Sequence, residues 1–404
     1  MKNQLLFITD NFPPETNAPA SRTYEHCVEW IKSGYRVKVI TCHPNFPFGK
    51  VYNGHKNKLI SREVLDCIEV IRLWSFIRPN SGFLLRAIDH LSFALISSIY
   101  CVLFVSADRI ITTSPQFFVN ITGLLYKFVR RKPWILELRD IWPESLKAVG
   151  SLNDGILFKL LERLELFFYR YASKIIVVTN SFKEDLSKRT ISPKKIEVVK
   201  NGVNTRFFNK KNIVKTYALP EDKIILGYIG THGMAHNLEF FLKAAAKLQV
   251  DESLYHFVFV GTGAQKEKLI QIANANNLKN VSFYDNVSKS EVPSILNQLD
   301  YALTHLKPEP TFLSVIPSKT FEIAAMQIPI INGVLGETAE IVSKNTIGVN
   351  YEPSSVDSFI NNLNQLNSDQ NLIEKIRSNQ VIFAQENSRQ KRAAQMLEYI
   401  TNIG

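Results

Sequence analysis

Short apolar runs recur along this chain, and segments long enough to form a helix separate most of them. The first run is Leu5–Thr9, residues 19–33 carry helical spacing, and Tyr35–Thr41 is a second run behind a glycine. A strand, a helix and a strand in this order predict a parallel, doubly wound sheet. Runs of the same kind follow at residues 109–113, 134–138, 174–179 and 196–199.

A second series of strand-like and helix-like segments begins after the turn at Asn201-Gly202. Its apolar runs cover residues 224–229, 257–260, 281–284 and 300–304. Because 404 residues exceed what one hydrophobic core usually serves, two domains are expected. The sequence therefore predicts an α/β protein with two Rossmann-like domains. They cover residues 1–200 and 201–382, and residues 383–404 are expected to pack back on the first domain.

The chain is basic, and its net charge of +11 indicates an anionic partner such as a nucleotide diphosphate, acidic lipid headgroups or nucleic acid. No nucleic-acid-binding motif occurs, so nucleic acid is not an expected partner. The four cysteines lack metal-type spacing; two disulfides are conceivable, but reduced cysteines in a cytosolic protein fit better. The apolar part of residues 1–14 is too short for a signal peptide.

The stretch TFLSVIPSKTFEIAAMQIPII, residues 311–331, places a carboxylate in a run of apolar and small residues. It predicts a short helix with Ser318 near the N-cap and Glu322 in the first turn. The free N–H groups of that turn, together with Lys319, are suited to an anion, while Glu322 can accept hydroxyl protons. A sugar nucleotide needs both features. A capped core helix with an incidental glutamate is the alternative interpretation.

Two glycine loops follow strands of the second series, at Gly230-Thr231-His232-Gly233 and at Gly261-Thr262-Gly263. Each suits a phosphate, although neither is specific by itself. No G-x-G-x-x-G follows the first strand of the chain, which disfavours a dinucleotide there.

Three loops of the first domain carry candidate contacts. Arg22, after the small residues of 17–21, could meet an anion or simply start a helix. The proline-broken loop 43–50 carries aromatic residues past the end of the second strand, where open α/β sheets bind ligands, and we expect acceptor contact there. The charged run RDIWPES, at residues 139–145, ends another strand, and Asp140 is the best carboxylate for acid–base or orienting work.

Residues 91–107 contain no charge and are of marginal length for a membrane span. We expect a helix that covers the sheet, with a helix resting on a membrane surface as the alternative. A basic and aromatic cluster nearby could meet anionic headgroups or be a solvated helix end. Its members are Lys127, Arg130, Arg131 and Lys132 beside Phe117, Phe118 and Trp134.

Four motifs resemble those of the family 4 glycosyltransferases, which have the GT-B architecture, and the likeness runs the whole length of the chain. They are NFPPE after the first strand, RDIWPES, VVKNGVNTRFF at 198–208 and PSKTFEIAA at 317–325. The loops NFPPETNAPASRTYEH and HPNFPFGKVYNG are most similar to the N-acetyl-L-fucosamine transferases of O-antigen and capsule synthesis.

The resemblance implies roles for particular residues. The family carries two glutamates with seven residues between them, and Glu322 matches the second, which holds the ribose hydroxyls. The first falls on Ser314, which would suit a deoxy or acetamido sugar with fewer hydroxyls. The family's diphosphate-binding Arg and Lys fall on Thr231 and His236, so Lys319 is expected to supply the missing charge. The family's histidine of the first domain falls at Arg139 or Asp140.

The resemblance thus implies a metal-independent, retaining transferase that takes a sugar from a UDP-sugar. The sequence contains no D-x-D pair of the kind that binds a metal. The acceptor would be an undecaprenyl-diphosphate-linked saccharide, met by the first domain at the cytoplasmic face of an anionic inner membrane. A UDP-sugar 2-epimerase and a non-catalytic bilobal binding protein are the alternatives. The expected catalytic residues are Asp140, Lys319 and Glu322. The expected donor-binding residues are Gly230, His232, Gly233, His236, Asp285, Asn286, Val287, Ser318, Lys319 and Glu322. The expected acceptor residues are Glu15, Ser21, Arg22, His43, Asn45, Arg139 and Asp140.

Overall fold

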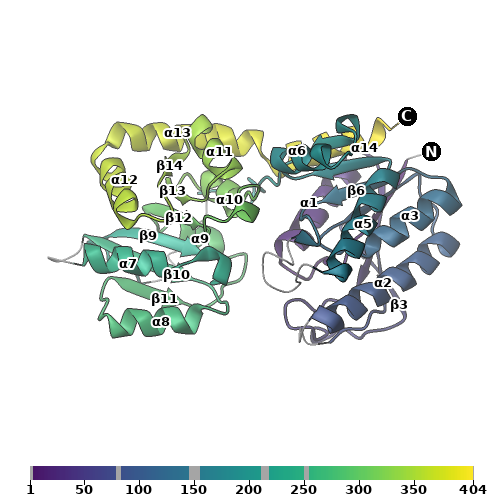
Figure 1. The fold of residues 1–404 in the computed structure, drawn as a ribbon, viewed down its shortest axis with the longest axis horizontal. Helices are drawn as coiled ribbons and strands as arrows, with labels where there is room; N and C mark the ends of the chain where they lie inside the picture. Colours follow the sequence, from purple (N-terminus) through teal and green to yellow (C-terminus); the bar gives the residue numbers. More distant parts are fainter. Residues whose placement is uncertain (1–2, 79–82, 145–154, 211–217, 250–253, 404) are drawn as a thin grey trace. The chain divides into compact units, whose positions relative to one another are not determined.

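The chain folds into two compact units in a computed structural model that describes residues 3–78, 83–144, 155–210, 218–249 and 254–403 (Figure 1). Unit 1 comprises Met1–Asn201 and Arg389–Gly404, and unit 2 comprises Gly202–Ser388. Each unit is described by itself. Ser145, the last residue of the RDIWPES motif, lies outside the described residues.

Unit 1 is built on an eight-stranded sheet in the order β3-β4-β2-β1-β5-β6-β7-β8. Neighbouring strands are parallel, except that β3 runs antiparallel to β4. The predicted doubly wound sheet is therefore confirmed, with β3 and β4 added at one edge. The strands are β1 (Gln4–Ile8), β2 (Arg36–Cys42), β3 (Ile60–Leu65), β4 (Ile68–Leu73), β5 (Arg109–Thr113), β6 (Trp134–Leu138), β7 (Lys174–Val177) and β8 (Ile196–Val198).

Helices cover both faces of this sheet because its strands are apolar on both sides. Successive side chains of a strand point to opposite faces, so Leu6 and Ile8 enter one core cluster while Leu5 and Phe7 enter another. The first face is covered by α2 (Phe83–Phe104), α3 (Val119–Arg130), α5 (Ile156–Tyr171) and α6 (Asn180–Lys188). The second face is covered by α1 (Ala18–Lys32) and α14 (Arg389–Thr401).

The expected basic and aromatic cluster does not form as predicted. Phe117 and Trp134 are buried in the first core cluster, and Phe118 is half-buried against it. The Trp134 ring donates a hydrogen bond to Thr112 Oγ1 at 2.8 Å, inside the core. The aromatic part of that prediction is wrong, because the spacing of aromatic residues along a sequence does not say which face of an element they occupy.

Unit 2 contains a six-stranded, wholly parallel sheet in the order β11-β10-β9-β12-β13-β14. Its strands are β9 (Ile224–Ile229), β10 (Tyr255–Val260), β11 (Val281–Tyr284), β12 (Tyr301–His305), β13 (Ile330–Gly333) and β14 (Gly348–Asn350). Its helices are α7 (Glu239–Leu248), α8 (Lys266–Ala275), α9 (Val292–Leu296), α10 (Lys319–Ala325), α11 (Glu337–Asn345), α12 (Val356–Ser368) and α13 (Gln370–Glu386). Short 3-10 turns lie at Met234–His236 and Pro310–Phe312 in unit 2, and at Pro193–Lys195 in unit 1.

The C-terminal helix belongs to unit 1, but this part of the unit starts later in the sequence than the predicted residue 383. Phe383 stays in unit 2, where its ring stacks on Phe321 at 5.6 Å. The segment that packs on unit 1 begins with Arg389, whose Nε donates to Glu25 Oε2 at 2.6 Å. Trp30 Nε1 then donates to the carbonyl of Ala393 at 2.9 Å, which fastens α14 to α1.

Candidate functional site

The carboxyl edge of the unit 2 sheet carries the residues expected to bind a donor. The short helix α10 begins at this edge, and its apolar residues Phe321 and Ala324 are buried in the core. This packing leaves Glu322, in the first turn, half-buried. Ser318 occupies the N-cap position, as predicted, although its side chain makes no capping hydrogen bond.

The ammonium group of Lys319 is buried beside this helix start without a hydrogen-bond partner among the described residues. Its Nζ lies 3.7 Å from the centroid of the Tyr228 ring, a cation–π contact. Burial lowers the pKa of Lys319 to about 7, although the charge of Glu322 opposes this shift. A group that pays this desolvation cost without a partner is a candidate for ligand binding.

Gly230 brings the loop after β9 against the same ammonium group. Its backbone has φ +143°, a conformation that side chains with a Cβ rarely adopt. A Cβ atom there would lie 2.8 Å from Lys319 Nζ. The glycine therefore allows the backbone to approach the cation closely, and the predicted glycine loop and the PSK motif meet in one place.

Two histidines of the same loop are neutral at pH 7. His232 is fully buried with neither ring nitrogen bonded among the described residues, and His236 is half-buried. Burial, followed by the positive charge of neighbouring lysines, lowers the pKa of both imidazoles to about 4. Neither ring therefore supplies the positive charge that a diphosphate needs, whereas Lys319 can.

One further histidine at this edge was not predicted. His305 ends β12 and is buried, with its Nδ1 at 2.7 Å from the hydroxyl of Tyr351. Its Nε2 has no partner among the described residues, and burial lowers the pKa of the ring to about 4. A histidine that closes an otherwise apolar strand was the signal available in the sequence.

The predicted base-binding residues follow β11, with β10 between them and β9. Asp285 is exposed, and its Oδ1 accepts from Lys266 Nζ at 2.6 Å. The same ammonium group donates to the carbonyl of Tyr284 at 2.9 Å. Lys266 thus holds the start of the loop that contains Asn286 and Val287.

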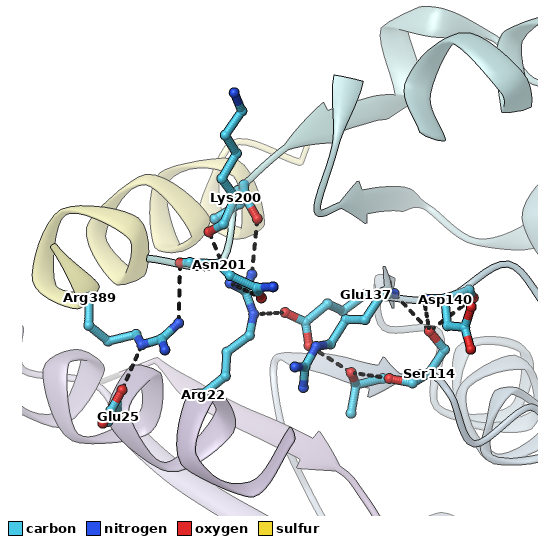
Figure 2. Close-up of polar contacts among 11 residues, drawn as sticks. Arg22, Glu25, Ser114, Glu137, Asp140, Lys200, Asn201 and Arg389 are labelled. Carbon is cyan, nitrogen blue, oxygen red and sulfur yellow. Dashed lines mark hydrogen bonds and ion pairs between the residues drawn. The ribbon is translucent and has the colours of Figure 1, made fainter. Parts of the chain in front are cut away.

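In unit 1, Arg22 is a structural residue, which corrects the expectation that it meets an acceptor. Its side chain is 1% exposed, and its Nε lies 2.8 Å from Glu137 Oε1 (Figure 2). Its other nitrogens donate to the carbonyls of Val199 and Lys200 at 3.1 and 3.0 Å. Arg22 therefore joins α1 and β6 to the segment that leaves unit 1 at Asn201.

Arg139 follows β6 and differs from Arg22 in that part of its guanidinium group has no hydrogen-bond partner among the described residues. Its Nε and Nη1 are buried and have no hydrogen-bond partner among the described residues. Burial lowers the pKa of Arg139 to about 9, against the attraction of Glu137 and with the repulsion of Arg22. The backbone N–H groups of Arg139 and Asp140 share Ser114 Oγ at 2.8 and 3.2 Å, which sets the turn after β6 (Figure 2).

Two of the remaining acceptor candidates, Glu15 and His43, are buried and bond to the backbone of nearby loops instead of lying on a free surface. Glu15 is buried, and its Oε1 accepts from the backbone N–H groups of Asn45 and Phe46 at 2.7 and 2.9 Å. His43, expected to contact an acceptor, is instead buried with Nε2 at 3.1 Å from the carbonyl of Lys58. Ser21 is half-buried at the start of α1.

Asp10, which directly follows β1, is a candidate that the sequence reading missed. Burial, and then the negative charges of Asp89 and Glu15, raise the pKa of its carboxyl group to about 8. Strongly shifted carboxyl groups at the carboxyl edge of a parallel sheet are candidates for proton transfer. Its position at the end of the first strand was the only sign in the sequence.

Two family models match consecutive parts of the chain. The model of Glycosyltransferase Family 4 matches residues 20–207, and the model of Glycosyl transferases group 1 matches residues 209–381. The probable glycosyltransferase WbjE of Pseudomonas aeruginosa is 24% identical over 61% of this chain and 63% of its own length, so the match spans less than two thirds of that protein. The putative colanic acid biosynthesis glycosyl transferase WcaI of Escherichia coli K12 is 24% identical over 90% of this chain and 91% of its own length.

Solved structures share the fold at low sequence identity. Sucrose-phosphate synthase from Thermosynechococcus elongatus matches with a TM-score of 0.76 and 15% identity, over 98% of each chain. The Alr3699/HepE protein of Anabaena, in complex with UDP and glucose, matches with a TM-score of 0.70 and 15% identity, over 99% of each chain. These likenesses concern the fold alone.

Proposed function

This chain belongs to the family 4 glycosyltransferases and has their GT-B fold, and from this premise we propose that it transfers a sugar from a UDP-sugar to a lipid-linked saccharide. The proposal continues that the reaction needs no metal and retains the configuration at the anomeric carbon. The process would be the synthesis of a bacterial surface polysaccharide, the class in which the relative WcaI is named.

The buried, unpartnered ammonium of Lys319 carries this proposal. A diphosphate placed beside it would restore the electrostatic stabilisation that the cation lost on leaving water. Gly230 leaves room for such an anion's approach because it has no side chain. UDP is a ligand of the Anabaena protein that shares this fold, which makes a uridine diphosphate the first anion to test.

In this proposal each residue of the α10 turn has a separate task. As the sugar leaves, negative charge builds on the β-phosphate, and Lys319 stabilises it there. Glu322 accepts hydrogen bonds from the ribose hydroxyls, and the backbone of Asp285–Val287 meets the base. A phosphate oxygen of the donor takes the proton of the acceptor hydroxyl, so that no separate base is required. Asp140 then orients the acceptor.

We assign the acceptor's charged group to Arg139. Its two buried N–H groups lack partners among the described residues, and a phosphate or diphosphate would satisfy them. An undecaprenyl-diphosphate-linked N-acetylhexosamine has such a group. An acceptor of this kind places the enzyme at the cytoplasmic face of the inner membrane.

For the sugar itself we propose an acetamido-deoxy hexose, with N-acetyl-L-fucosamine as the first candidate. The support is Ser314, which stands where the family's first glutamate would read donor hydroxyls. A serine offers fewer acceptor sites than a carboxylate, which suits a sugar with fewer hydroxyls.

The purified protein should be tested with a panel of UDP-sugars and lipid-linked acceptors, with products followed by mass spectrometry. Release of UDP only when both substrates are present supports the proposal. Conversion of a UDP-sugar to an isomer without any acceptor would instead identify an epimerase and overturn it.

A further inference from the structure

Three helices of unit 1 share an exposed apolar face. α2, α3 and α5 lie side by side over one face of the sheet (Figure 1). Fourteen of the twenty-five exposed large apolar side chains among the described residues belong to these three helices. So strong a concentration on one face marks an interaction surface rather than scattered exposure.

Helix α2 carries a stripe of exposed apolar side chains from Ile88 to Leu103. The most apolar eighteen residues within its segment Leu85–Phe104 have a mean hydropathy of 1.7, but only 33% of them are buried. Phe93 and Cys101 face the core, which makes α2 part of the folded domain rather than a separate span. Exposed residues recur at intervals of three or four, the spacing of one helix face. They are Ile88, Leu91, Leu95, Ile99 and Leu103.

The two neighbouring helices extend the same surface. α3 contributes Phe128, and α5 contributes Phe167 and Tyr171, all of them exposed. The Phe128 and Tyr171 rings meet edge to face at 5.6 Å, and Phe167 lies 4.6 Å from Tyr171. These contacts join α3 and α5 into a continuous surface. We call this surface and the exposed residues of α2 together the three-helix face.

Most of the exposed charge on these helices is positive; Glu162, whose side chain is 37% exposed, lies 3.8 Å from Arg189. Among the residues of α2, α3 and α5 whose burial is described, every other exposed charged residue is basic. They are Arg86, Arg130, Lys159, Arg163 and Arg170. A second copy of the chain packed on this surface would bring like charges together, whereas an anionic lipid surface is complementary.

We propose that the three-helix face docks on an anionic membrane, with α2, α3 and α5 lying in the plane of the interface. Their apolar side chains would enter the boundary between headgroups and acyl chains while the basic side chains meet lipid phosphates. The inference rests on the proposed function, since a lipid-linked acceptor is what would require a membrane partner.

The test is co-sedimentation of the full chain with phosphatidylcholine vesicles, with and without phosphatidylglycerol. Ile99→Glu on α2 has a matched control in Ile382→Glu on α13 of unit 2, because the two isoleucines are 60% and 58% exposed. The wild type should bind anionic vesicles only. Ile99→Glu should weaken this binding roughly tenfold, the effect of losing one buried aliphatic side chain, and Ile382→Glu should not.

Charge is tested separately with Arg163→Gln and Arg170→Gln, each expected to weaken binding roughly fivefold. Equal losses in Ile99→Glu and Ile382→Glu would overturn the proposal. So would binding that ignores phosphatidylglycerol, or a dimer in light scattering that Ile99→Glu dissociates.

Transfer to a water-soluble acceptor analogue separates this inference from the proposed function. Ile99→Glu should retain full transfer because the residue is remote in sequence and element from the α10 turn. If the wild type transfers no sugar but binds vesicles as expected, the proposed function fails and the docking surface stands. If transfer is normal but vesicle binding is absent, only the docking surface fails.

Discussion

The Lys319 ammonium lies over the ring of Tyr228, 3.7 Å from its centroid, and among the described residues it has no hydrogen-bond partner. An aromatic ring offsets only part of the cost of burying a cation. The charge on Lys319 is therefore sensitive to pH and to any anion that binds beside it.

Affinity for UDP should fall as pH rises above about 7, the pKa to which burial lowers Lys319. Above that pH the free enzyme holds a neutral amine, and binding a diphosphate must take up a proton. The dissociation constant should then rise about tenfold for each pH unit until the pKa of the complex is reached. Calorimetry in buffers of different ionisation enthalpy measures both the dissociation constant and the number of protons taken up on binding. An unchanged pH slope in Lys319→Met would refute the assignment.

Lys319→Met and Glu322→Ala should each lower transfer at least about a hundredfold, because Lys319 stabilises the charge that builds on the β-phosphate and Glu322 holds the ribose that positions the donor. The controls are Lys344→Met and Glu340→Ala on α11, where both residues are exposed. Circular dichroism and thermal melting should show folded protein for all four variants. Near-normal turnover in either site variant would mean that the donor lies elsewhere.

Gly230→Ala should weaken UDP binding more than about tenfold, because the new Cβ would lie 2.8 Å from Lys319 Nζ and displace it. Gly54→Ala is the matched control, since Gly54 also has a positive φ but has no atom within 4 Å of the added Cβ. Both substitutions should cost about 1–3 kcal/mol of stability from backbone strain. Equal UDP affinity in the two variants would contradict the predicted contact.

Glu137→Gln should destabilise unit 1 by about 3–5 kcal/mol, because it leaves the buried Arg22 charge uncompensated. All four tryptophans lie in unit 1, so their fluorescence in urea reports this unit alone. The exposed pair Lys132–Asp108 of the same unit is the control, and Lys132→Gln should cost less than about 1 kcal/mol.

Acid should weaken the ion pair between Arg22 and Glu137. Although burial opposes ionisation, the charges of Arg22 and Arg139 hold the pKa of Glu137 below its usual value. Its contribution to stability is therefore present above the pKa of the unfolded chain, about 4.3, and is lost as pH falls through the lower folded value. A Glu137→Gln variant should lose that part of the acid sensitivity of unit 1, and an identical acid profile would show that another carboxyl group is responsible.

Transfer should proceed at the same rate after dialysis against EDTA, because the proposed stabilisation of the leaving diphosphate comes from Lys319 rather than from a metal. Rates measured with and without added Mg²⁺ or Mn²⁺ test this expectation. Loss of transfer in EDTA, restored by one of these ions, would contradict it.

The central strands were predictable because they are buried on both faces and read as apolar runs. Arg109–Thr113, Trp134–Leu138 and Ile224–Ile229 were predicted with the bounds that the structure has. The edge strand β3 was missed, since ISREVL is mostly exposed and mixes charged with apolar residues. Strand β13 was missed because its apolar residues directly follow those of α10.

The same limit applies to the site. Glu322 and Lys319 were identifiable because a charged residue at the start of an apolar helix is unusual and the PSK motif is similar to a known one. Arg22 was misread, since a loop arginine that meets a ligand and one that meets a buried glutamate have the same local sequence. Asp10 and His305 were missed because nothing beside them in the sequence reports their burial.

The sequence by itself determined the two parallel sheets, the order of their elements and the two chemical groups at the start of α10. These follow from local periodicity and from short motifs, which neighbouring residues encode. The tertiary structure decided which charged groups have hydrogen-bond partners, because Arg22 bonds to Glu137 across 115 positions of sequence while the Lys319 ammonium lies over an aromatic ring. Burial sets the cost of a charge, and burial depends on residues that are distant in the chain.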